Sequence, residues 1–300
     1  MESSVLSEAR FDVHRVITDK IVEAIERGAG EFVMPWHRGG PGIGRPTNAA
    51  TGQKYRGVNV VALWGEATLT GYASGSWASF RQWQKLGASV RKGEHGTVIV
   101  FYKRFDAEAR GEDEEERAGP RMFARASRVF NAEQVTGYAE PLPTVPAPVD
   151  VLPEVEAVVE GTKAVIVHGG SRAYYDRAAD RIHIPDRHRF LGTPTSSPTE
   201  SFCATVLHEL THWSGAGHRL NRQLGERFGD DAYAFEELVA ELGAAFLCGD
   251  LRIANDPRPD HAAYLASWLS VLKRDRQAIF AAARLATAAA DYITGLSVPF

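Results

Sequence analysis

The spacing of apolar residues in the first part of the chain predicts both helices and strands. An amphipathic helix is expected over residues 11–28, where apolar side chains recur every three or four positions. Two strand-like runs, residues 97–105 and 124–135, can pair as a long hairpin on either side of an acidic insert at residues 106–120. This pattern is typical of an α+β arrangement.

Two apolar helices dominate the second part of the chain. One is expected to begin at Thr199 and the other covers residues 235–247. A strand at 181–185 is expected to border a substrate groove beside the first of these helices, where it would pair with an extended peptide. The remaining predicted elements are a helix at 155–162, a strand at 164–168 and packing helices from 264 to 292.

Length and proline content predict two domains. Three hundred residues are about the size at which a single hydrophobic core stops growing. Residues 139–153 hold a third of the 15 prolines, which is typical of an extended linker. We therefore predict a first domain at residues 1–140, a linker at 141–153 and a second domain at 154–300.

Charge, cysteine content and hydropathy narrow the class of protein. A net charge of −4 gives no overall signal for nucleic-acid binding, so any basic surface must be local. Cys203 and Cys248 form no CxxC motif or disulfide framework, as expected for a reducing compartment. No stretch approaches the roughly 20 apolar residues of a membrane span. A soluble, cytoplasmic protein without a membrane partner is expected.

The helix that begins at Thr199 carries a metal-binding pattern. His208, Glu209 and His212 spell HExxH. Residues four apart lie on one face of a helix, so both imidazoles can bind one cation, as in zinc peptidases. The Glu209 carboxylate can then take a proton from the attacking water. We expect Zn²⁺, or another divalent ion such as Mn²⁺, with Glu209 as the catalytic residue.

A catalytic zinc needs a third protein ligand, for which the sequence offers two sources. The helix at 235–247 carries three glutamates, and we favour Glu237 as the ligand with Glu241 behind it as an orienting group. The reverse assignment and Glu236 stay open. His218 would instead complete the pattern HExxHxxGxxH, but none of the three methionines lies downstream to form the turn that accompanies it.

Residues 34–105 differ from the rest of the chain in charge. They contain ten Lys or Arg against two glutamates, with ten aromatic residues interleaved. Such a composition suits single-stranded nucleic acid, whose phosphates follow basic grooves and whose bases stack on aromatic rings. The predicted DNA-binding residues are Trp36, Arg45, Lys54, Tyr55, Arg56, Trp77, Trp83, Arg91 and Lys92.

The aromatic residues of this region also have a simpler interpretation as core side chains. For Trp36, Tyr55, Trp77 and Trp83 the sequence does not separate the two interpretations. Trp64, Phe80 and Phe101 are expected in the core, and Trp77, Phe80 and Trp83 are expected on one short helix.

Several segments carry a resemblance to a known family. They are PTNAATGQKYRGVNVVALW, GYASGSWASFRQWQKLGASVRKGEHGTVIVFY, RVFNAEQV, HELTHWSG, RLNR and YAFEELVAELGAAFLC. Both regions together resemble the ArdC family of plasmid antirestriction proteins, whose N-terminal region also begins some conjugative plasmid primases. The resemblance implies an N-terminal domain that binds single-stranded DNA. It also implies a zincin-like C-terminal domain, in which the HExxH histidines and a downstream glutamate hold a divalent metal.

Two functions are compatible with this organisation. In the first, a single-stranded-DNA-binding protein with a zinc metallopeptidase domain acts on an unknown protein substrate and protects plasmid DNA from restriction during conjugation. In the alternative, the protein is not an enzyme, the metal only braces the fold, and protection comes from occlusion of the DNA.

Overall fold

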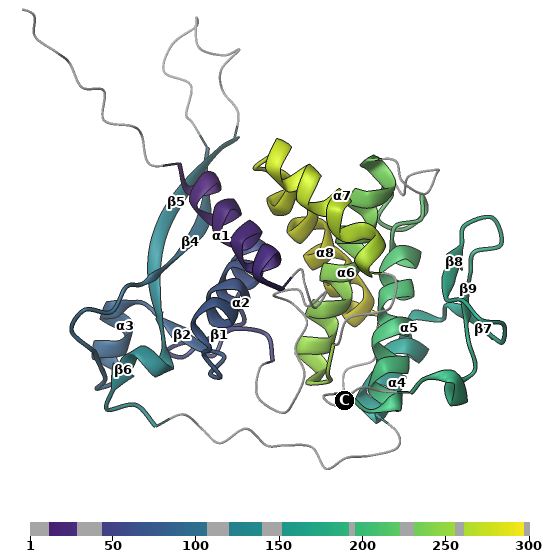
Figure 1. The fold of residues 1–300 in the computed structure, drawn as a ribbon, viewed down its shortest axis with the longest axis horizontal. Coiled ribbons are helices and arrows are strands. Elements are labelled where there is room, and N and C mark those ends of the chain that lie inside the picture. Colours follow the sequence, from purple (N-terminus) through teal and green to yellow (C-terminus); the bar gives the residue numbers. More distant parts are fainter. Residues whose placement is uncertain are drawn as a thin grey trace, which may run out of the picture.

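The computed structural model describes residues 12–28, 44–106, 120–139, 152–191, 196–222, 231–255 and 261–296. Helices and strands occur throughout, and the predicted α+β class is confirmed (Figure 1). Residues 12–139 are named the N-terminal half and residues 152–296 the C-terminal half. Most of the predicted linker and of the acidic insert lies outside the described residues, so the domain boundaries stay a prediction.

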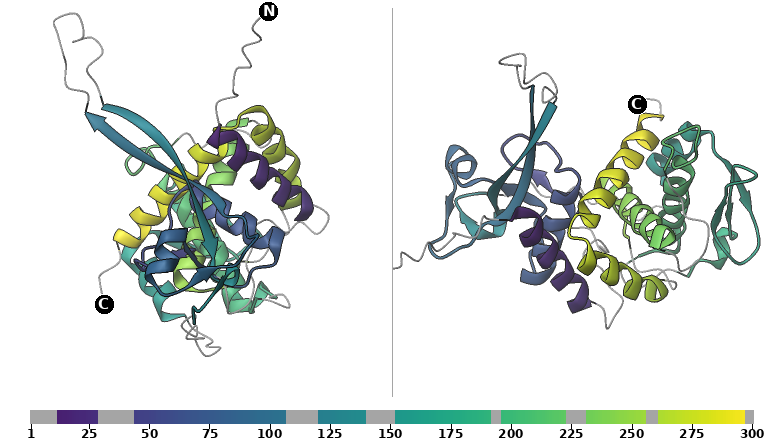
Figure 2. Two further views of the ribbon diagram at one scale, coloured as in Figure 1. Left: turned by 90° about the vertical axis from the view of Figure 1, so that its left-hand side faces the viewer. Right: turned by 90° about the horizontal axis from the view of Figure 1, so that it is seen from above.

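The N-terminal half is built on a four-stranded sheet with the order β1-β2-β5-β4. The two long strands are β4 (Thr97–Asp106) and β5 (Pro120–Asn131). All of β4 pairs antiparallel with residues 120–129 of β5, which confirms the predicted hairpin (Figure 2). The other elements of this half are β1 (Thr47–Asn48), β2 (Ser76–Ala78), β3 (Ser89–Val90), β6 (Val135–Thr136), α1 (Val13–Gly28), α2 (Val58–Thr70) and α3 (Phe80–Lys85).

Helix α3 is shorter than predicted and does not contain Trp77. Ser79 caps it through a reciprocal pair of hydrogen bonds with Gln82, so the helix begins only at Phe80. Trp77 lies before this cap, in β2, where it pairs with Asn131 of β5. The sequence pattern missed the boundary because the strand and the helix are both too short to show a period.

The aromatic residues expected in the core behave differently from one another. Trp64 on α2 is 1% exposed, which confirms its prediction. Phe80 and Phe101 are each 48% exposed, and for them the prediction was wrong. Phe101 lies on the same face of β4 as the buried Ile99. The elements that pack on this face of the sheet therefore bury Ile99 but do not extend as far as Phe101.

The C-terminal half combines helices with a three-stranded sheet of the order β7-β9-β8. The central strand β9 (Arg181–Ile184) pairs with both β7 (Val165–His168) and β8 (Tyr174–Asp176), so the prediction that a peptide pairs with this strand was wrong. No helix among the described residues has the length and apolar character needed to span a membrane. The helices are α4 (Pro153–Thr162), α5 (Pro198–Ser214), α6 (Asp231–Leu251), α7 (His261–Arg274) and α8 (Ala278–Gly295).

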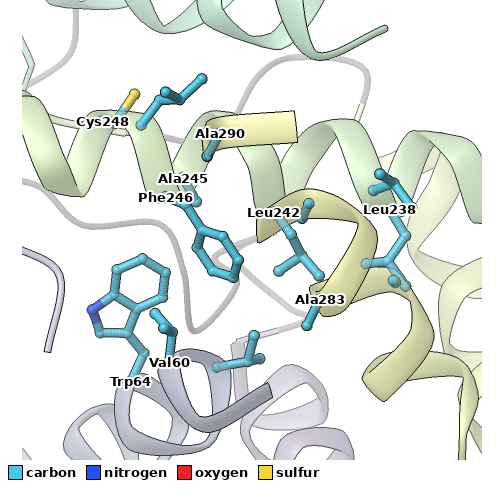
Figure 3. Close-up of a cluster of buried hydrophobic side chains, with 14 of the residues drawn as sticks. Val60, Trp64, Leu238, Leu242, Ala245, Phe246, Cys248, Ala283 and Ala290 are labelled. Atoms are coloured by element: carbon cyan, nitrogen blue, oxygen red, sulfur yellow. The ribbon is translucent and has the colours of Figure 1, made fainter. Parts of the chain in front are cut away.

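A single hydrophobic core joins the two halves. Figure 3 shows Trp64 of α2 next to Phe246 of α6, with Ala283 and Ala290 of α8 nearby. The Trp64 and Phe246 ring centroids are 5.9 Å apart, and neither side chain is more than 1% exposed. Burial of one large apolar side chain contributes about 1.5–3 kcal/mol. Packing therefore fixes the N-terminal half against α6.

The segment at residues 44–57 connects the halves through charge. The buried Arg45 guanidinium lies 2.9 Å from Asp250 at the end of α6, and the Lys54 ammonium lies 2.8 Å from the other oxygen of Asp250. Arg56 pairs with Asp291 of α8. All three basic residues were predicted to contact DNA, but in this structure they bind carboxylates of the C-terminal half.

The buried and exposed ion pairs between the halves should differ in their effect on stability. Asp250→Ala leaves Arg45 buried without its counter-charge, and we expect the free energy of unfolding to fall by about 3–5 kcal/mol. Asp291→Ala breaks a pair whose side chains are 62% and 47% exposed, and we expect a loss of at most about 1 kcal/mol. Chemical denaturation measures both, and equal losses would contradict the assignment.

Candidate metal centre

Helix α5, which carries the HExxH motif, begins one residue before its predicted start. Ser197 is the N-cap, and Pro198 occupies the first turn, where a missing N–H is tolerated. Ser197 and Glu200 form a reciprocal capping box. Glu200 also accepts a hydrogen bond from the backbone N–H of Ala254, just beyond α6. The start of α5 is thus tied to the end of α6.

His208 and His212 lie one turn apart on α5 and point toward the same place. Their Nε2 atoms are 3.2 Å apart, and the ring planes meet at 76°. His208 is 2% exposed and His212 is partly buried. Two lone pairs that converge in this way can be shared by one cation.

Helix α6 approaches α5 closely at Gly243. A Cβ atom at this position would lie 2.5 Å from Cγ2 and 2.8 Å from Oγ1 of Thr211, so a larger residue could be accommodated only if the Thr211 side chain turned away or the helices moved apart. The close contact brings the acidic part of α6 against the histidines of α5. The three glutamates carried there are Glu236, Glu237 and Glu241, all buried.

Glu237 completes a set of three converging ligand atoms. Its Oε1 is 3.4 Å from Nε2 of His212, and its Oε2 is 3.7 Å from Nε2 of His208. Three zinc ligands at 2.0–2.2 Å from the ion, in tetrahedral arrangement, are themselves about 3.3 Å apart. The three residues therefore fit a divalent cation in the His₂Glu arrangement.

The other two glutamates of α6 lie behind the histidines. Glu236 Oε1 is 3.3 Å from Nδ1 of His212, and Glu241 Oε2 is 3.5 Å from Nδ1 of His208. A carboxylate at the outer nitrogen of a ligating histidine fixes the tautomer and orients the ring. The geometry thus favours Glu237 as the ligand and places a carboxylate near the outer nitrogen of each histidine, within hydrogen-bond geometry at His212 but not at His208.

Arg222 stabilises the centre through Glu236, the carboxylate behind His212. The sequence alone did not identify this residue. Its Nε and Nη2 donate to the two oxygens of Glu236, at 3.1 and 2.8 Å. It also donates to the carbonyl of Thr211 and to Oγ of Ser214, at 2.6 and 2.9 Å. Arg222 therefore joins the last turn of α5 to α6. Its only sequence signal was its place in the RLNR motif.

The electrostatics of the centre favour a positive charge between the carboxylates. Burial alone would lower the pKa of His212, but the carboxylates of Glu237 and Glu236 outweigh it and raise that pKa to about 10. Burial alone would raise the pKa of Glu237, but His212 and His208 bring it well below the usual range. For Glu236, His212 and Arg222 overcome burial in the same way and lower the pKa.

Glu209 and His218 take different positions relative to the centre. Glu209 is 4% exposed and follows His208 in the chain, and its charge contributes to the raised pKa of His212, so it lies near the centre. The side chain of His218 is 65% exposed, and its Nε2 lies 3.4 Å from Asp180. The turn after Ser214 carries His218 away from the centre, which excludes it as the third ligand.

The aromatic residues predicted to stack on DNA are mostly core residues. Tyr55, Trp77 and Trp83 are 7%, 1% and 0% exposed, so none of them presents a ring face to a ligand, and their interpretation as stacking residues was wrong. Burial raises the pKa of the Tyr55 hydroxyl to about 12. Trp36 lies outside the described residues.

The basic residues predicted to contact DNA divide into two groups. Arg45, Lys54 and Arg56 bind acids of the C-terminal half, as described above. Arg91 and Lys92 lie in an exposed turn, where Arg91 Nη2 is 2.7 Å from Glu94. Among the described residues, Arg91 and Lys92 are thus not engaged by the C-terminal half, whereas Arg45, Lys54 and Arg56 are.

Separate replacement of the inner and outer carboxylates should distinguish their roles. Glu236→Gln and Glu241→Gln alter the orientation of a histidine, and we expect each to weaken Zn²⁺ binding about 10–100-fold. Glu237→Gln removes a ligand and should weaken binding further. Competition with a chromophoric chelator measures the affinity, with His218→Ala as an unaffected control. A larger loss for Glu241→Gln than for Glu237→Gln would reverse the assignment.

Family models match both halves of the chain. Residues 153–285 match a zincin-like metallopeptidase family, and residues 11–130 match the N-terminal domain of the anti-restriction factor ArdC.

Similar sequences include one of unknown role and one enzyme. The uncharacterized protein y4eC of Sinorhizobium fredii is 42% identical over 292 residues, which span 94% of this chain and 91% of y4eC. DNA primase TraC of Escherichia coli is 34% identical over 306 residues, which span 96% of this chain but 27% of TraC.

Two solved structures share the architecture. The metal-free crystal structure of antirestriction protein ArdC from plasmid R388 is 36% identical, with a TM-score of 0.78 over 96% of this chain and 98% of that one. Its Mn(II)-bound form is 35% identical, with a TM-score of 0.75 over 97% of this chain and 100% of that one. These matches indicate a divalent metal site. With its zincin-like C-terminal half, the chain described here belongs to the ArdC family of antirestriction proteins.

Proposed function

We propose that this protein binds single-stranded DNA through its N-terminal half and hydrolyses peptide bonds at the metal centre of its C-terminal half. In this role it would protect plasmid DNA from restriction during conjugation, in the cytoplasm. The observation that carries the enzymatic part is the convergence of His208, His212 and Glu237 next to a buried Glu209. A metal that only braced the fold would not need an acid beside it.

The proposed reaction assigns one task to each group. His208, His212 and Glu237 would hold the cation, which when bound supplies the positive charge that polarises the peptide carbonyl. Glu209 accepts a proton from the attacking water and then donates it to the nitrogen of the leaving amine. Zn²⁺ suits this nitrogen and oxygen donor set, and the Mn(II)-bound relative supports the use of related ions.

The DNA-binding part is supported by the family and by the surface of the N-terminal half. ArdC is an antirestriction protein and TraC is a DNA primase, so these two relatives act in processes that involve DNA. Exposed cations remain on α3 and on the turn that carries Arg91 and Lys92. The shared core then holds the metal centre at a fixed position relative to any bound strand.

Replacement of the proposed proton-transfer group tests the enzymatic part. Glu209→Gln keeps the shape of the side chain but cannot accept the proton. We expect unchanged Zn²⁺ and DNA binding and a loss of about 10²–10⁴-fold in the cleavage of a DNA-bound protein. The exposed Glu154→Gln serves as the matched control. Cleavage is measured with the full chain, and protection by restriction of incoming plasmid DNA.

The same variants separate the non-enzymatic alternative. If Glu209→Gln protects plasmid DNA as well as the original chain, while charge reversal of Arg91 and Lys92 abolishes protection, occlusion of the DNA would account for the function. Loss of protection in Glu209→Gln with intact DNA binding would support the peptidase.

Metal binding should release a proton. With a pKa of about 10, His212 is protonated at neutral pH when no cation is bound, whereas a cation requires the neutral imidazole. Affinity should therefore fall as the pH is lowered, by up to about tenfold per unit between about pH 9 and 6. Titration calorimetry in buffers of different ionisation enthalpy counts the protons, and a count of zero would contradict the raised pKa.

A further inference from the structure

One surface of the N-terminal half keeps its cations exposed. Helix α3 packs beside β3 and β5, on the side of this half that faces away from the C-terminal helices (Figure 1). Two acids near α3, Glu94 and Glu133, are already engaged. Glu94 accepts hydrogen bonds from Arg91 and Gln134, and Glu133 accepts them from the backbone N–H groups of Ala73 and Ser74. The exposed cations around α3 are Arg81, Lys85, Arg91, Lys92 and Arg128.

An exposed aromatic ring lies on the same helix as two of these cations, Arg81 and Lys85. Phe80 is the first residue of α3, and the capping box of Ser79 fixes its place. The ring is 48% exposed, although an edge-to-face contact with Phe130, at 6.4 Å between centroids, supports it from one side. A large apolar ring in this position gains little for the fold, since almost half of its surface stays in water.

Gly96 brings the supporting ring and a guanidinium together. A Cβ atom at position 96 would lie 3.0 Å from the Phe130 ring and 3.1 Å from Cβ of Arg128, so both side chains rest on the bare backbone. Arg128 Nη1 also donates to the carbonyl of Gly96, at 2.9 Å. The strand pattern places Phe130 and Arg128 on one face of the sheet, because they are two residues apart.

We propose that Phe80, supported by Phe130 and flanked by Arg128, forms a stacking subsite for one unpaired base of single-stranded DNA. This inference rests on the proposed DNA-binding function and deepens it. A nucleic acid fits better than a protein partner, because five exposed cations lie on α3, on the turn after β3 and on β5, and both acids named above are engaged. A single strand fits better than a duplex, because the bases of a duplex already stack on one another.

The opposite face of the same sheet provides matched controls. Phe101 has the same 48% exposure as Phe80, and it is paired with the exposed Arg125. The register Thr97↔Val129 places Phe101 and Arg125 on the face opposite to Phe130 and Arg128. Replacement on either face therefore removes a similar side chain at a different place.

The test measures anisotropy of a labelled oligothymidine and of a duplex of equal length, with the full chain and five variants. Phe80→Ala should weaken single-strand binding about 5- to 150-fold, the range for loss of one stacked base, and leave the salt dependence unchanged. Arg128→Gln should lower the slope of log affinity against log salt by about 0.7. Phe101→Ala and Arg125→Gln should leave single-strand binding unchanged. Phe80→Trp, which restores a ring, should bind like the original chain.

The outcomes separate this inference from the function on which it rests. If the original chain does not bind the single strand, the proposed DNA-binding function fails together with the subsite. If it binds but Phe80→Ala binds equally well, only the subsite is overturned. Equal losses for Phe80→Ala and Phe101→Ala, or an equal loss of duplex binding, would also overturn it.

Discussion

The close approach of α5 and α6 at Gly243 is the constraint on which the metal centre depends. Every side chain of the centre lies on one of these two helices, and the distance between the helices decides whether the carboxylate of Glu237 reaches the imidazoles. Even one added methyl group at Gly243 would meet Thr211, and overpacking of this kind costs about 1–3 kcal/mol. Arg222 and Glu200 hold the same two helices together at opposite ends of α5.

Helix α6 serves both halves of the molecule at once. Glu236, Glu237 and Glu241 face α5, whereas Phe246 packs on Trp64 and Asp250 binds Arg45 of the N-terminal half. The helix is therefore apolar or paired on nearly every side, as expected for a helix buried within a larger core. A movement of the N-terminal half relative to α6 would therefore displace the helix that carries the candidate ligand Glu237.

Local patterns predicted the elements and the centre well. HExxH and the three glutamates of FEELVAELGAAFL are set by spacing within single helices, so the sequence indicated candidate ligands and the structure places three of them together. The hairpin of β4 and β5 was likewise visible as two alternating runs. Glu236 stayed open as a possible third ligand, because the sequence does not show which face of a buried helix packs against its neighbour.

Contacts between residues far apart in the chain could not be predicted from the sequence. Arg45 finds its acid 205 positions later, and composition cannot distinguish such an internal pair from a phosphate contact. Trp77 and Trp83 lie in a three-residue strand and a six-residue helix, where no period shows which rings are buried. The same limit hid Phe80, which was assigned to the core and lies on the surface.

The shared core also bears on how this protein could be dissected. A fragment that begins at α4 would keep every residue of the metal centre. It would, however, expose the apolar side of α6 around Phe246 to solvent, and the carboxylate of Asp250 would lose its ion pair with Arg45. We expect such a truncated chain to self-associate through this exposed apolar surface. We therefore expect that the C-terminal half is not an autonomous module that can be excised at the proline-rich segment.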